Sequence, residues 1–246
     1  MASSHVAERP HERRGENLYP CRLTQEFGDF TMTLDVPEGV WNPTPHGVAL
    51  GHALLDLDFA GEHVLELGTG CGIHAILLAR QGARRLTLTE IEAPIIDNAR
   101  HNLVRNGIDV EVEGLVCDWT AVPGASHAGD AIWDTVVTNP PFAKSGKRYR
   151  RYFIDMLILD AHKLVRPGGR LVFVQSSMAD IPRSLRMMAE CGMETRIVAE
   201  TSGPFRAYYF EDDAFRREMA TVPGGYTVSD GRHYERLIVF EARLPR

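Results

Sequence analysis

Four consecutive residues, Asn139-Pro140-Pro141-Phe142, follow an apolar, β-branched run at 133–138 that predicts a buried strand. Two prolines fix the backbone and remove two N–H donors, so the local carbonyl groups are left to accept hydrogen bonds. A substrate NH₂ group could donate one hydrogen to the Asn139 side chain and the other to the Pro140 carbonyl, while Phe142 stacks on the planar group. The motif therefore predicts a clamp for a planar nitrogen, formed by Asn139, Pro140, Pro141 and Phe142.

A glycine-rich loop, Gly68-Thr69-Gly70-Cys71-Gly72, lies between a predicted strand at 63–67 and a predicted helix that runs through residue 81. Glycines let the backbone turn sharply and let a ligand approach the chain without a Cβ in the way. The dinucleotide-binding fingerprint is GxGxxG or GxGxxA. This loop reads GxGxG, with Ile73 where the third small residue would fall, so its spacing argues against a dinucleotide.

Acidic residues stand at the ends of three successive predicted strands, in register with the glycine loop. Glu66 would suit the cationic end of a ligand, such as the amino group of S-adenosylmethionine. Glu90 would accept hydrogen bonds from both ribose hydroxyls, and Asp118 from an adenine amino group. Each acid alone is typical of a solvated strand end, but the three together predict a cofactor site. Its predicted residues are Glu66, Gly68, Thr69, Gly70, Gly72, Glu90, Ile91, Asp118, Trp119 and Asn139.

The segment ELGTGCG, the acid after the second strand and CDW after the third strand resemble the class I S-adenosylmethionine-dependent methyltransferases. The resemblance covers about residues 40–202 and the final strand. It implies S-adenosylmethionine as the cofactor and a seven-stranded sheet whose last strand is antiparallel. The NPPF motif resembles NPP[FY] of the amino- and amide-nitrogen methyltransferases, which act on glutamine of release factors, on adenine or guanine amino groups, or on small molecules. Residues 40–46 are similar to the lead-in of the glutamine-type enzymes, which closes over the cofactor.

The spacing of apolar residues predicts the elements that position these motifs. Short β-branched runs alternate with helical patterns from residue 61 onward, which indicates an α/β fold with a doubly wound, Rossmann-like sheet of seven mostly parallel strands. Ligands of such sheets bind at the carboxyl ends of the strands. The expected strands lie at 63–67, 85–90, 109–117, 133–138, 170–175, 194–200 and 236–242, and the later helices at 93–105, 152–165 and 181–190.

Length and composition predict one domain with two additions. Residues 1–16 are polar and read as a disordered tail, and residues 17–246 as a single methyltransferase domain with an N-terminal cap at 17–60. An aromatic-rich stretch at 203–234 is too long for a simple hairpin connection and predicts a functional insert. Candidate substrate residues are Tyr152, Ser202, Phe205 and Tyr208. The insert aromatics could instead pack it onto the core, and His46 is expected to start a helix rather than touch substrate.

Charge and composition limit the partners. There are 27 Lys+Arg against 33 Asp+Glu, a net charge of −6, which argues against broad binding to nucleic acid or anionic membrane. No apolar run approaches the ~18–20 residues of a membrane span. The four cysteines are far apart, and the first residues lack the apolar stretch of a signal peptide, so we expect a cytoplasmic protein. The ten histidines show no metal-ligand spacing, and no metal site is predicted.

These features favour an N-methyltransferase that acts on a planar amino or amide nitrogen of a small molecule, amino acid or peptide. One alternative is a cyclase that cuts S-adenosylmethionine into azetidine-2-carboxylate and methylthioadenosine. Another is a tRNA or rRNA base amino-group methyltransferase, in which the basic loop at 144–152 would contact phosphates. A non-catalytic cofactor-binding module and an NAD-dependent oxidoreductase fit the motifs less well. The oligomeric state is not predicted.

Overall fold

The structure, a computed structural model of the chain, describes residues 21–118, 121–122, 132–142, 150–206, 209–210 and 212–246. In chain order the elements are β1 (Cys21–Phe27), β2 (Phe30–Val36), α1 (Pro45–Leu54), β3 (His63–Leu67), α2 (Ile73–Arg80), β4 (Arg85–Glu90), α3 (Ala93–Arg105), β5 (Glu111–Val116), β6 (Trp133–Thr138), α4 (Tyr152–Leu159), α5 (Ala161–Leu164), β7 (Val165–Ser176), the 3-10 helix η3 (Ser177–Ala179), α6 (Ile181–Glu190), β8 (Glu194–Pro204), α7 (Asp213–Met219), β9 (Thr227–Ser229) and β10 (Arg232–Arg243).

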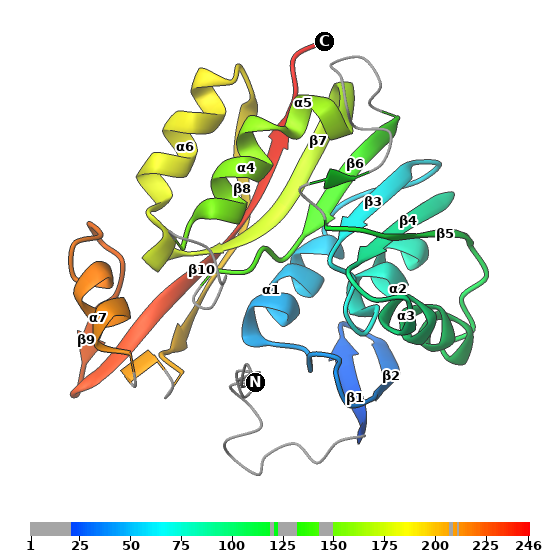
Figure 1. Ribbon diagram of the computed structural model, residues 1–246, viewed down its shortest axis with the longest axis horizontal. Coiled ribbons are helices and arrows are strands. Elements are labelled where there is room, and N and C mark those ends of the chain that lie inside the picture. The colour runs from blue at the N-terminus through cyan, green and yellow to red at the C-terminus, as the bar shows by residue number, and fades with distance from the viewer. Residues whose placement is uncertain (1–20, 119–120, 123–131, 143–149, 207–208, 211) are drawn as a thin grey trace, which may run out of the picture.

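The main sheet has the strand order β5-β4-β3-β6-β7-β10-β8, and β9 pairs with β10 (Figure 1). Strands β3 to β7 pair in parallel, whereas β10 runs antiparallel to β7, β8 and β9. The predicted doubly wound sheet of seven mostly parallel strands with an antiparallel last strand is therefore confirmed. The short strand β9 is an addition that the sequence patterns did not predict.

Alternating strand residues face two separate helical layers, as the two-residue period of a strand requires. Val64 and Val172 pack with α1, α2 and α3 in one hydrophobic cluster. Their chain neighbours Leu65 and Leu171 pack with α4, α5 and α6 in the other. Both faces of the sheet are thereby covered, which explains why its strands read as continuous apolar runs.

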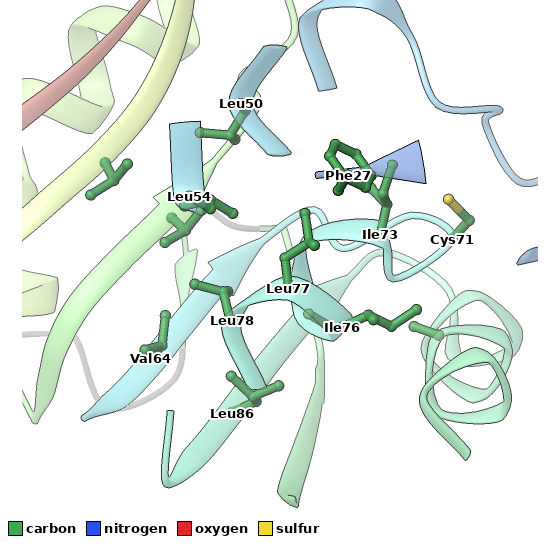
Figure 2. Packing of buried hydrophobic residues seen from close by; sticks show 14 of the residues in the cluster. Phe27, Leu50, Leu54, Val64, Cys71, Ile73, Ile76, Leu77, Leu78 and Leu86 are labelled. Carbon is green, nitrogen blue, oxygen red and sulfur yellow. The ribbon is translucent and has the colours of Figure 1, made fainter. Parts of the chain in front are cut away.

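Figure 2 shows the first of these layers, in which side chains from α1, α2 and β1 gather over β3 and β4. Close packing of β1 depends on a glycine in α1. A Cβ at Gly51 would lie 2.5 Å from Cε1 of Phe27, whose ring is buried. The N-terminal hairpin therefore belongs to the same hydrophobic core as α1, α2 and α3.

Two asparagines, Asn102 on α3 and Asn106 at its C-cap, hold the N-terminal hairpin by pairing with the backbone of β2. The side chain of Asn102 accepts from the Asp35 N–H and donates to the Asp35 carbonyl, both at 2.9 Å. Asn106, one helical turn later, does the same with Thr33 at 2.9 and 2.8 Å. Asn102 also donates to the carbonyl of Cys71 at 2.9 Å. One side chain thus connects the edge of the hairpin to the glycine loop.

The predicted helix at 152–165 is present as two shorter helices. The helix breaks at Asp160 into α4 and α5, and β7 begins already at Val165. The Arg166-Pro167-Gly168-Gly169 segment, read as a helix stop, lies within the strand, where the pairing of β6 with β7 is irregular. A Cβ at Gly169 would lie 2.5 Å from the Asp134 carbonyl oxygen, so glycine allows the two backbones to approach.

Strands β8 and β10 are longer than predicted. They continue together beyond the end of β7, and this extension leads into α7 and β9 at one end of the sheet (Figure 1). The division into a cap at 17–60 and an insert at 203–234 stays a prediction, and the predicted tail at 1–16 lies outside the described residues. No helix among the residues that the structure describes is long and apolar enough to cross a membrane.

Candidate active site

Parallel register brings the predicted site residues to one edge of the sheet. Leu67 at the end of β3 pairs with Thr89 of β4 and Thr138 of β6, and Glu90 pairs with Val116 of β5. The loops that follow these four strands therefore start side by side. The strand ends and these loops carry the glycine loop, Glu90, Asp118 and the NPPF motif.

The glycine loop is shaped to admit a ligand. Gly68, Gly70 and Gly72 have φ angles of 72°, 53° and 80°, in the left-handed region that side chains other than glycine rarely adopt. A Cβ built at Gly68 or Gly70 meets no atom of the described residues within 4 Å, whereas one at Gly72 lies 3.1 Å from Cα of Ala99. The loop is thus open at its first two glycines and packed on α3 at the third. This cradle fits the S-adenosylmethionine predicted from sequence.

Glu90 shapes the loop from the next strand. Its carboxylate accepts from the Gly70 N–H at 2.9 Å and from the Ile91 N–H at 3.2 Å. Burial raises the pKa of Glu90 above its ordinary value, against the opposing effect of these two backbone hydrogen bonds. Each carboxylate oxygen keeps a second lone pair, so Glu90 fits its predicted contact with ribose hydroxyls. Ile91 is 66% exposed beside it.

The Glu66 carboxylate has two hydrogen-bond partners inside the protein. It is buried and accepts from the Thr69 hydroxyl at 2.7 Å, while its other oxygen lies 3.1 Å from Nδ1 of His74. Nε2 of His74 lies 2.8 Å from the Gly47 carbonyl oxygen. Each Glu66 oxygen keeps a second lone pair beside its partner, as in Glu90, so its contact with a cofactor amino group stays a prediction. Asp118 is exposed at the predicted strand end, and Trp119 lies outside the described residues.

Asn139 lies at the end of β6, half-buried, beside the first turn of α1. A Cβ on Gly47 would be 3.6 Å from Nδ2 of Asn139 and 3.7 Å from Nε2 of His74. The residues predicted to close over the cofactor therefore lead into a helix whose start adjoins the clamp. Thr44 caps this helix by accepting from the Gly47 N–H at 3.2 Å, which fixes the first turn.

The rest of the NPPF motif is anchored to both the domain and the insert. Pro140 is buried and Pro141 is exposed. Phe142 is half-buried, and its ring centroid lies 6.3 Å from that of Phe215 on α7, edge-on. The guanidinium of Arg150 lies over the same Phe215 ring, 4.7 Å from its centroid, in a cation–π contact. The Phe142 ring therefore already packs against α7, and the predicted stacking on substrate would use another part of the same ring.

The predicted substrate residues are spread over several elements. Tyr152 is half-buried at the start of α4, with its ring edge-on to Phe153, and Ser202 is exposed on β8. Phe205 packs among aromatic residues of the insert, with ring centroids 5.4 Å from Tyr209 and from Tyr226. This arrangement fits the alternative in which the aromatics pack the insert. Tyr208 lies outside the described residues.

Sequence reasoning missed a polar cluster around His46, in the first turn of α1 beside Asn139. Nε2 of His46, in the first turn of α1, lies 3.4 Å from the carboxylate of Glu235 on β10. Ser176 and Tyr209 also donate to that carboxylate, and Arg206 contacts His46. Glu235 directly precedes the strand predicted at 236–242, and His46 stands in the lead-in at 40–46. Nothing in the sequence pairs residues so far apart along the chain.

Comparisons with known proteins identify the family of the chain. Residues 48–206 match the family described as the methyltransferase small domain. Ribosomal RNA small subunit methyltransferase C of Pseudomonas aeruginosa is 34% identical over 150 residues, which are 60% of this chain and 41% of that protein. The enzyme of the same name from Escherichia coli is 29% identical over 146 residues, 59% of this chain and 39% of that protein. The chain thus spans about two fifths of the length of these relatives.

Solved structures show the same fold. The Thermus thermophilus 16S rRNA N2 G1207 methyltransferase, in complex with AdoMet and guanosine, matches with a TM-score of 0.60 at 20% identity, over 92% of this chain and 50% of that chain. The M. jannaschii tRNA m1G37 methyltransferase matches with a TM-score of 0.58 at 12% identity, over 94% of this chain and 58% of that chain.

The family match covers more than half of the chain, and the chain therefore belongs to the methyltransferase small domain family. Its class is that of the S-adenosylmethionine-dependent methyltransferases, with the Rossmann-like fold described above. The narrower resemblance to release-factor glutamine methyltransferases finds no counterpart among these relatives.

Proposed function

We propose that this protein transfers a methyl group from S-adenosylmethionine to the exocyclic amino nitrogen of a guanine base in RNA. The observation that carries the proposal is the position of Asn139, at the carboxyl end of β6 beside the glycine loop and the first turn of α1. The relatives named as ribosomal RNA methyltransferases favour this nucleic-acid alternative over the small-molecule or peptide acceptor that the acidic net charge suggested.

The clamp works by positioning. The bound cofactor supplies an electrophilic methyl group on its sulfonium sulfur. Asn139 and the Pro140 carbonyl would each accept one hydrogen of the acceptor NH₂ group and so hold its nitrogen facing the cofactor. With the cofactor bound, the new N–C bond would form as the S–C bond breaks, and the acceptor nitrogen would lose one proton to water. Such positioning can supply several kcal/mol, up to roughly 7–11 in the best intramolecular cases.

Local charge can support RNA binding despite the net charge of −6. Arg217 and Arg232 are exposed on the insert side of the site, and Arg216 is exposed beside its partner Asp213. Arginine suits phosphate because its planar guanidinium donates two parallel hydrogen bonds. If these side chains contact phosphates, turnover on RNA falls steeply as salt concentration rises.

The test is to incubate the protein with methyl-labelled S-adenosylmethionine and 16S ribosomal RNA, naked and in small subunits, and to identify the modified nucleoside by mass spectrometry. N2-methylguanosine is the expected product. Transfer to adenine, or to a glutamine-containing release-factor peptide with none to RNA, would contradict the proposal. Methylthioadenosine formed without acceptor would instead support the cyclase alternative.

Asn139→Ala separates the clamp from the cofactor site. We expect turnover to fall by about 100-fold or more, because a misplaced acceptor loses in-line geometry. Affinity for S-adenosylhomocysteine should change less than about twofold, since the cofactor contacts of the glycine loop and Glu90 remain. Calorimetric binding and single-turnover rates measure the two quantities. Equal losses in both would assign Asn139 to the cofactor instead of the acceptor.

A further inference from the structure

The carboxylate of Glu235 joins three parts of the chain that are far apart in sequence. Glu235 lies on β10 and is 3% exposed. The Ser176 hydroxyl, at the end of β7, donates to its Oε2 at 2.5 Å, and the Tyr209 hydroxyl donates to its Oε1 at 3.4 Å. His46 on α1 lies 3.4 Å from Oε2 through its Nε2. A buried carboxylate is strongly unfavourable without such partners, so the contacts hold one another in place.

The direction of the hydrogen bonds follows from the chemistry of the partners. Nη2 of Arg206 lies 2.9 Å from Nδ1 of His46. A guanidinium can only donate, so Nδ1 accepts, and Nε2 carries the proton that Glu235 accepts. The chain of contacts therefore runs from Arg206 through His46 to Glu235. It ties the first turn of α1 to residues on both sides of the α7–β9 region.

The contacts of His46 lie next to the proposed clamp. His46 is followed directly by Gly47, and a Cβ on Gly47 would lie 3.6 Å from Nδ2 of Asn139. Phe142 of the same motif packs against Phe215, and both belong to the hydrophobic cluster that contains Tyr209. Helix α7 thus meets the NPPF motif through an apolar contact, and Arg206 and Glu235, which flank the α7–β9 region in the chain, meet the first turn of α1 through hydrogen bonds to His46.

We propose that Glu235 is a positioning residue for the acceptor: it holds His46, and with it the first turn of α1, so that Gly47 stays beside Asn139 while the acceptor nitrogen is clamped. The kinetic part of this inference rests on the proposed function. The structural part, that Glu235 orders the first turn of α1, stands without it. The catalytic contacts remain those of Asn139 and Pro140.

The experiment compares Glu235→Gln with a matched control, Glu241→Gln. Glu241 is an equally buried carboxylate on the same strand, but it pairs with Arg170 and Arg196 at the opposite edge of the sheet. Hydrogen exchange of the full chain with S-adenosylhomocysteine bound is measured first. Glu235→Gln should accelerate exchange several-fold in the peptide spanning 44–54, and Glu241→Gln should leave that peptide unchanged.

Kinetics with ribosomal RNA are measured second, well below the melting temperature of each variant. Glu235→Gln should lower kcat by roughly 10- to 100-fold, with affinity for S-adenosylhomocysteine within about twofold of wild type. His46→Gln should do the same, and the double variant should lose little more than either single one. Glu241→Gln should keep the wild-type kcat.

The outcomes separate the two proposals. If wild type does not methylate RNA, the proposed function fails, and the exchange data alone decide whether Glu235 orders α1. Unchanged exchange at 44–54 in Glu235→Gln overturns the inference. So does faster exchange with an unaltered kcat, because the ordering would then have no bearing on the acceptor. Equal kinetic losses in Glu235→Gln and Glu241→Gln would show a general effect of stability.

Discussion

At the scale of single residues, Gly47 leaves space beside Asn139, a residue of the proposed clamp. Gly47 has no positive φ, and the nearest contacts of an added Cβ, at 3.6 to 3.8 Å, are ordinary van der Waals distances. Gly47→Ala should therefore fold normally, with helix stability unchanged or raised by up to about 1 kcal/mol. Its methyl group would lie against the Asn139 amide, so we expect turnover to fall at least about tenfold.

Gly51→Ala is the matched control, because it makes the same change one turn later in α1. There the Cβ would lie 2.5 Å from the buried Phe27 ring, and overpacking of this kind costs about 1–3 kcal/mol. Urea unfolding should thus show loss of stability in Gly51→Ala and none in Gly47→Ala, while turnover at low temperature falls only in Gly47→Ala. Wild-type turnover in Gly47→Ala would remove the first turn of α1 from the acceptor site.

Glu90 makes a second residue-scale prediction, on pH. Its pKa is raised by burial, so in the free protein it takes up a proton at a higher pH than an ordinary glutamate. A protonated carboxyl is a poorer acceptor for ribose hydroxyls, and the affinity for S-adenosylhomocysteine should fall as pH drops through that pKa. Glu90→Gln should bind about fivefold more weakly at pH 8, since hydrogen bonds to charged groups are about 1 kcal/mol stronger.

Calorimetric titrations across pH 8 to 5 compare the two proteins. The curve of Glu90→Gln should be flatter than that of wild type, because the titrating group is gone. Parallel curves would assign the pH dependence to another residue and place Glu90 outside the ribose contact.

At the scale of elements, the N-terminal hairpin and the glycine loop are joined through one side chain of α3. Asn102 is completely buried and pairs with both backbone groups of Asp35 and with the Cys71 carbonyl. Asn102→Ala leaves these groups without partners, at about 1–3 kcal/mol each when buried. We expect a loss of about 3 kcal/mol in the free energy of unfolding, together with weaker cofactor binding.

The control for this change is Asn106→Ala. Asn106 makes the same pair of contacts one turn along, with Thr33, but is only half-buried and does not reach the loop. Water can replace part of what it loses, so the loss of stability should be smaller and cofactor affinity should stay near wild type. A similar drop in affinity for both variants would mean that the hairpin, not the Cys71 contact, supports the loop.

At the scale of the whole molecule, carboxylates with lowered pKa join distant parts of the chain. The hydrogen bond from Arg22 lowers the pKa of Asp35 to about 2. Burial opposes ionisation of Glu235 and Glu241, but the contact with His46 in one case and with Arg170 in the other leaves each pKa below its ordinary value. Asp35 ties the hairpin to α3, Glu235 ties α1 to β10, and Glu241 ties β10 to its neighbours β7 and β8.

The sign of the pH effect follows from linkage. A carboxyl whose pKa is lower in the folded than in the unfolded chain stabilises the fold above its unfolded pKa, and this contribution is lost as pH falls through the folded pKa. Urea unfolding should therefore give a stability nearly constant from pH 7 to about 5 and falling from about pH 4.5 towards 2. Glu90, with its raised pKa, acts in the opposite sense. Stability that rises on acidification to pH 3 would contradict this picture.

Sequence alone determined the order of the seven main strands, the glycine loop and the NPPF motif, because these depend on local patterns: β-branched runs, helical spacing, and turn residues at fixed offsets. Parallel alternation then predicted that the carboxyl ends of the parallel strands share one edge, with Asn139 near Gly68 and Glu90. The start of β7 was missed because its Pro-Gly-Gly segment has the local signature of a helix end. In the fold, Gly169 allows this segment to approach β6 closely, and the segment joins the strand.

Only the tertiary structure decided which polar groups face one another. Glu66 reads as a ligand for a cationic cofactor end, yet the fold turns it inward to Thr69 and His74. His46 reads as a helix start, yet it meets Glu235 from the far end of the chain. Such pairings depend on the packing of α1 against a sheet whose last strand runs antiparallel. No spacing within either segment carries that information, because the free energy of the contact arises only when both are buried together.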